Sequence, residues 1–158
     1  MSMRLSEDDM KRMLATAAIL GLTAGAAAAE EHVVEMLNEG PDGERMVFSP
    51  AVIMAEPGDT VRFVPTDKGH NAQTVDAVLP DEVEGFRGGI NQEVTYEIPA
   101  DGTYLIRCTP HYGLGMVALI VAGGDISNLD AIEEERMPRR ADQRLDDYIA
   151  EAREMAEG

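Results

Sequence analysis

The chain has no tryptophan, a single cysteine and only two lysines among its 158 residues. Aromatic residues make up 4%, so a packed core must consist mainly of aliphatic side chains and methionine. One cysteine excludes an internal disulfide and leaves a free thiol, a catalytic thiol or a metal ligand. The shortage of basic residues gives a net charge of -17, which argues against nucleic acid and anionic membranes as partners. The length suits one domain.

The N-terminal segment has the pattern of an export signal. A basic pair precedes an apolar run over residues 13–23, and small residues ending in alanines follow before the chain becomes acidic at Glu30. This pattern predicts a signal peptide, residues 1–29, that is cleaved after Ala29 and directs the protein to the periplasm. The run is short for a membrane span, so an uncleaved anchor is the less favoured alternative. Acidic residues near the start also leave open a translation start at Met10.

Residues 30–124 alternate short apolar segments with turn-forming residues. Residues 94–98 alternate apolar and polar side chains, as a half-buried strand does. Residues 116–121 are apolar on both faces, which predicts a central strand. Residues 56–59 place proline second and glycine third, as a type II turn requires. The spacing of these segments predicts a mainly β protein with a β-sandwich, in which residues 71–89 form a long connection over one end.

Residues 125–158 change to a helical pattern. Ser127 or Asn128 can cap a short helix that ends near Arg136, and Pro138 suits the first turn of a second helix. Apolar residues recur in the second helix at spacings of three and four: Ala141, Leu145, Tyr148, Ile149, Ala152 and Met155. We expect these helices to pack on the sandwich, and the alternative is a helix that binds a partner.

The segment from Cys108 to Met116 combines a thiol, an imidazole and a thioether within nine positions. Cys108 ends a predicted strand, His111 follows in a loop that Pro110 stiffens, and Met116 begins the next strand. A second imidazole is available upstream at His70. Two histidines, one cysteine and a weak axial methionine are typical of a blue-copper electron-transfer site.

Other functions fit these residues less well. Zinc accepts cysteine and histidine but favours water or a fourth strong ligand over a thioether. A copper enzyme needs an open coordination position or a second copper ion, and the third histidine, His32, has no ligand-like neighbours and is expected at the surface. A copper carrier or storage protein remains the alternative, although its clustered methionines are missing because the ten methionines here are scattered.

The sequence resembles the pseudoazurins, small blue-copper proteins of the cupredoxin family, over nearly all of the chain after residue 31. The matching segments are residues 36–38, 46–48, 57–61, 65–71, 90–91 and 108–113. The resemblance implies an eight-stranded Greek-key sandwich with two C-terminal α-helices and no enzymatic activity. It also implies one type 1 copper ion, Cu(II)/Cu(I), at one end of the sandwich, with the ligands His70, Cys108, His111 and Met116.

The resemblance further implies how the site is supported and used. Asn71 would tie the first ligand loop to the backbone beside the cysteine. Electrons would pass through the exposed edge of His111, within an apolar patch that includes Pro110, Gly113 and Leu114. The implied partners are redox proteins such as a nitrite reductase or a c-type cytochrome, and the implied state is a monomer.

The sequence departs from the family around this patch. Leu114 stands where methionine is common, and Asp76 and Gly89 stand where lysine is common, although Lys68 and Arg87 are present. These changes leave the redox partner undetermined. Because the acidic residues are spread over the whole chain, we interpret the net charge of -17 as adaptation to salt rather than as a docking signal.

Overall fold

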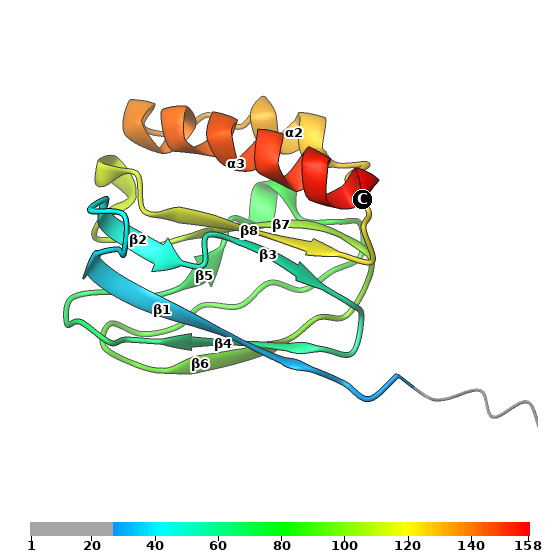
Figure 1. The fold of residues 1–158 in the computed structure, drawn as a ribbon, viewed down its shortest axis with the longest axis horizontal. Helices are drawn as coiled ribbons and strands as arrows, with labels where there is room; N and C mark the ends of the chain where they lie inside the picture. Colours follow the sequence, from blue (N-terminus) through cyan, green and yellow to red (C-terminus); the bar gives the residue numbers. More distant parts are fainter. Residues whose placement is uncertain (1–26) are drawn as a thin grey trace, which may run out of the picture.

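The computed structural model describes residues 27–158 and has two four-stranded sheets with two α-helices on one side (Figure 1). The strands are β1 (Glu31–Glu39), β2 (Arg45–Ser49), β3 (Val52–Ala55), β4 (Thr60–Val64), β5 (Gln73–Thr74), β6 (Val94–Glu97), β7 (Gly102–Arg107) and β8 (Val117–Ala122). The helices are α2 (Leu129–Glu133) and α3 (Arg139–Glu157), with short 3-10 turns η1 (Asp76–Val78) and η2 (Tyr112–Leu114). The predicted Greek-key sandwich with two C-terminal helices is confirmed. Most of the predicted signal peptide lies outside the described residues.

The two sheets have the strand orders β2-β1-β4-β6 and β3-β8-β7-β5. Strand β1 pairs antiparallel with β2 and parallel with β4, while β8 pairs parallel with β3 and antiparallel with β7. Every residue of β8 is buried, which confirms that this doubly apolar segment is central. Between the sheets, Phe48 and Phe63 meet edge to face with ring centroids 5.9 Å apart, among mostly aliphatic neighbours.

The tight turn before β4 has the predicted form, because Gly58 has a φ of +95° and the Asp59 amide donates to Glu56 O at 3.0 Å. The Asp59 carboxylate is buried and accepts hydrogen bonds from the amides of Glu30 and Glu56 and from His32 Nε2. These donors lower the pKa of Asp59 to about 2. The expectation that His32 is a plain surface residue was wrong, since its imidazole is partly buried against this carboxylate.

The connection over residues 71–89 is more regular than the sequence suggested. It contains β5, which pairs antiparallel with β7 through Gln73 and Arg107, and the η1 turn. A strand of two residues is too short to leave an alternating pattern, so periodicity could not find it.

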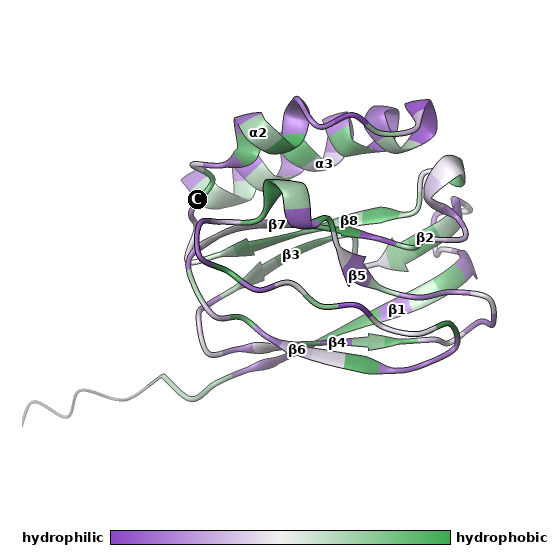
Figure 2. Ribbon diagram, turned by 180° about the vertical axis from the view of Figure 1, so that it is seen from behind, coloured by the Kyte–Doolittle hydropathy of each residue, from purple (hydrophilic) through white to green (hydrophobic). Residues whose placement is uncertain are grey.

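The C-terminal helices cover the outer face of the second sheet, over the apolar strands β3 and β8 (Figures 1 and 2). Helix α2 is shorter than expected and starts after Asn128, whose side chain bonds to the backbone of Thr103 instead of capping the helix. The second predicted helix is α3, which starts at Arg139, so Pro138 is its N-cap residue and not part of its first turn. Four of the six stripe residues are buried, whereas Tyr148 is partly buried and Met155 is exposed.

Candidate metal centre

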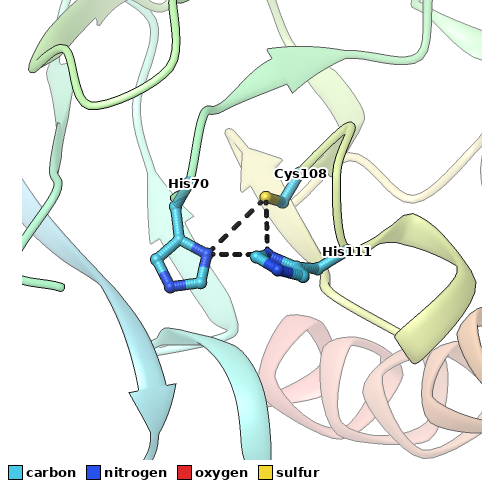
Figure 3. A group of neighbouring side chains, drawn as sticks. All are labelled: His70, Cys108 and His111. Atoms are coloured by element: carbon cyan, nitrogen blue, oxygen red, sulfur yellow. Dashed lines mark hydrogen bonds between the residues drawn. The ribbon is translucent and has the colours of Figure 1, made fainter. Parts of the chain in front are cut away.

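Three of the four predicted ligands, His70, Cys108 and His111, bring their donor atoms together (Figure 3). His70 lies in the loop between β4 and β5, Cys108 directly follows β7, and His111 lies in the loop before β8. His70 and Cys108 are fully buried, and His111 is partly exposed. Residues from distant parts of the chain therefore present their donor atoms to one point.

The spacing of the three donor atoms fits a transition-metal ion. His70 Nδ1 and His111 Nδ1 are 3.0 Å apart, and Cys108 Sγ lies 3.8 Å and 3.7 Å from them. In the plane of these three atoms, the point equidistant from them lies about 2.0 Å from each. This distance is close to metal–nitrogen and metal–sulfur bond lengths of about 2.0–2.3 Å. Two imidazoles and one thiolate are a donor set that copper accepts in both oxidation states.

Hydrogen bonding orients the His70 ring for this role. His70 Nε2 lies 2.9 Å from Asn38 Oδ1, and because an amide oxygen only accepts, Nε2 carries the ring proton. The lone pair of Nδ1 therefore faces Cys108 and His111. Burial, followed by the charge on His111, lowers the pKa of His70, which keeps the ring neutral as a metal ligand requires. Sequence reasoning gave Asn38 no role.

The cysteine is held by backbone contacts on both sides. The Cys108 amide donates to Met116 O at 3.0 Å, and the Thr109 amide donates to Asn71 Oδ1 at 2.7 Å. Asn71 Nδ2 also donates to Gly88 O at 3.1 Å, so one amide side chain joins three segments around the site. Burial raises the pKa of the Cys108 thiol, so the metal-free site favours the neutral thiol, and metal binding must release its proton.

The fourth predicted ligand, Met116, is fully buried at the end of the loop that carries His111. Its amide donates to His111 O at 3.1 Å, which closes the loop tightly around η2. Gly115 has a φ of +91°, a conformation that favours glycine, and this residue turns the chain into β8.

The surface beside His111 contains the residues predicted to form an apolar patch. Pro110 and Gly113 are exposed, and Leu114 is 42% exposed. The guanidinium of Arg107 lies over the ring of Tyr112, with its central carbon 5.3 Å from the ring centroid. This contact fixes the loop to β7. Among the described residues, no helix combines the length and apolar character needed to cross a membrane.

Comparisons with known proteins agree with this geometry. Residues 34–123 match the copper-binding proteins of the plastocyanin/azurin family. The chain is 46% identical to a pseudoazurin of Paracoccus pantotrophus over 87% of this chain and 93% of that protein. Among solved structures, a pseudoazurin from Sinorhizobium is 42% identical, with a TM-score of 0.76 over 78% of this chain and 97% of that one. A pseudoazurin from Hyphomicrobium denitrificans is 46% identical, with a TM-score of 0.73 over 77% and 97%.

Proposed function

The chain belongs to the pseudoazurins, within the plastocyanin/azurin family of copper-binding proteins, and from this premise we propose how it holds its metal and passes electrons. It is a type 1 blue-copper electron-transfer protein and not an enzyme. We assign the ligands as His70, Cys108, His111 and Met116. The mutual approach of the two Nδ1 atoms and Sγ carries this assignment. A copper ion held by these residues would supply one-electron chemistry between Cu(II) and Cu(I).

The chain around the site suits electron transfer because it leaves the ligands little freedom. Asn71 links the His70 loop to the amide that follows Cys108, and Asn38 fixes the ring of His70. A site that moves little between oxidation states has a small reorganisation cost. Buried ligands from two linked loops also favour retention of the metal, which supports electron transfer over the alternative of a copper carrier.

We propose that electrons leave through the exposed edge of His111, inside the patch of Pro110, Gly113 and Leu114. The remaining ligands are buried, so this edge is the shortest route to a partner. A nitrite reductase is the preferred partner class, and a c-type cytochrome is the second. The protein would meet either as a monomer, with residues 30–124 as the sandwich and residues 125–158 as the packed helices.

The Leu114→Glu variant tests this docking surface. A carboxylate in the patch must lose its hydration when the partner docks, so we expect the electron-transfer rate to nitrite reductase at low protein concentration to fall about tenfold. The visible spectrum should stay the same because Leu114 is not a ligand. Met155→Glu is the matched control, since Met155 is also 42% exposed but lies near the end of α3. If Leu114→Glu slowed electron transfer no more than Met155→Glu does, the docking face would lie elsewhere.

We also propose that the protein is exported to the periplasm and starts at Glu30 after cleavage. The Glu30 nitrogen lies 2.8 Å from the carboxylate of Asp59, which can accept a new α-ammonium group without rearrangement. N-terminal sequencing of the protein isolated from its native source should therefore find Glu30, or a residue within one or two of it, at the first position. An intact Met1 or Met10 would overturn the periplasmic assignment.

A further inference from the structure

One arginine of α3 reaches across to the loop that carries His111. The Arg144 side chain is only 18% exposed, and its guanidinium has four oxygen acceptors. Nη1 donates to Met46 O at 2.7 Å and to Gly115 O at 3.0 Å. Nη2 donates to Arg45 O at 2.6 Å and to the Glu44 carboxylate at 2.8 Å. This side chain thus joins the start of β2 to the loop before β8, which lie at the same end of the molecule (Figure 1).

The contact holds one particular peptide group. The carbonyl of Gly115 accepts from Arg144 and from the Val117 amide, each at 3.0 Å. The amide of the same peptide, on Met116, donates to His111 O at 3.1 Å. The peptide is therefore bonded at both ends and cannot rotate freely. The backbone of α3 also lies against it, because a Cβ on Gly115 would come within 3.0 Å of Arg140 O.

We propose that Arg144 is a positioning residue for the metal centre, which fixes the Gly115–Met116 peptide and thereby the reach of the Met116 side chain. This inference rests on the proposed role of Met116 as the axial ligand. The axial contact tunes the reduction potential of such sites, so a residue that sets the backbone of Met116 acts on the potential without touching the metal.

Two simpler explanations make different predictions. If Arg144 acts only as a charge, its positive charge favours the less positive Cu(I) state, and a lysine should serve as well as arginine. If Arg144 only stabilises the fold by joining α3 to β2, its loss should lower the melting temperature and leave the spectrum unchanged. A positioning role requires the planar fork, because a lysine ammonium cannot bridge the acceptors on both sides.

The test compares Arg144→Lys and Arg144→Gln with Arg153→Gln in the copper-loaded protein. Arg153 lies on the same helix and, within residues 27–158, pairs only with Asp130 and Glu133 of α2. Its variant therefore controls for loss of charge and for loss of a helix contact. We expect both Arg144 variants to shift the reduction potential and the intensity ratio of the two thiolate-to-copper bands. Arg153→Gln should leave both unchanged. An Arg144→Lys variant that matches the wild type in both measurements would overturn the proposal.

A second measurement needs no copper. In the metal-free protein, hydrogen exchange of the Met116 amide should become about tenfold faster in both Arg144 variants, because a charge-assisted hydrogen bond to its peptide is lost. The amide of Ile120, within β8, serves as the reference and should not change relative to Arg153→Gln. Unchanged exchange at Met116 would also overturn the proposal. The Met116→Leu variant separates this proposal from the ligand assignment. If it leaves the spectrum and the reduction potential unchanged while the Arg144 variants still speed exchange at Met116, then Met116 is not a ligand, but Arg144 does hold the Gly115–Met116 peptide.

Discussion

Replacing Cys108 with serine is expected to abolish the blue colour of the copper-loaded protein completely. The intense band at about 600 nm arises from charge transfer between a thiolate and copper. Cys108 is the only cysteine in the chain that can supply this thiolate. A serine hydroxyl does not ionise at neutral pH and is a hard donor, so neither the band nor tight binding of Cu(I) should survive. The measurement is a visible spectrum of the purified variant after addition of one equivalent of copper.

The control for this variant is Met116→Leu, which also changes a fully buried residue of the same loop. Because the axial contact is weak, this variant should keep copper and its blue band while its reduction potential shifts. Far-UV circular dichroism of the metal-free proteins should show that both variants keep the sandwich. A Cys108→Ser protein that stays blue would disprove the ligand assignment.

The sequence contained the chemistry of the site but not its geometry. Cys108 and His111 are close in the sequence, so their spacing on a stiff loop could be interpreted directly. His70 lies 38 residues upstream of Cys108 and could be assigned only by its residue type and its polar loop. Asn38 and Arg144 were missed, because an asparagine in a strand and an arginine on a helix give no local signal of contacts made 32 and 29 residues away.

The fold was predictable in segments that are long enough to show a periodic pattern of apolar residues. The apolar run of β8 and the stripe of α3 are long enough to indicate burial, and both were found. Strand β5 has two residues, which is too short for an alternating pattern, and it was missed. Helix α2 was predicted, but with five residues it is shorter than expected. The pairing of His32 with Asp59 depends on the parallel register of β1 and β4, in which His32 faces Val61, and no local pattern encodes that register.

The acidity of the chain leaves many carboxylates without an ionic partner. Within residues 27–158, seven of the 27 acidic residues form ion pairs. Repulsion between the remaining carboxylates destabilises the fold. In helix α3, for example, Asp147 and Glu151 are four residues apart and repel each other. Its last turn carries acidic residues and no basic one, opposite to what the helix dipole favours.

We therefore expect the melting temperature of the copper form to rise between 0.01 M and 1 M sodium chloride. Over this range the screening length falls from about 30 Å to about 3 Å, so the self-repulsion of a charge of -17 is largely removed in the folded state. Differential scanning calorimetry measures the effect. The experiment should include sucrose at matched osmolality, because excluded solutes stabilise folded proteins without screening charge.

The Glu154→Lys variant separates screening from other effects of salt. Glu154 is exposed near the end of α3, so a lysine there removes a repulsion and places a positive charge where the helix dipole favours it. The variant should melt higher than the wild type at 0.01 M salt, and the difference should shrink at 1 M. If the acidity instead steers a basic partner, salt should slow the association of the two proteins and leave the melting temperature flat. A flat or falling melting temperature, together with a reaction that salt slows steeply, would therefore favour docking over adaptation to salt.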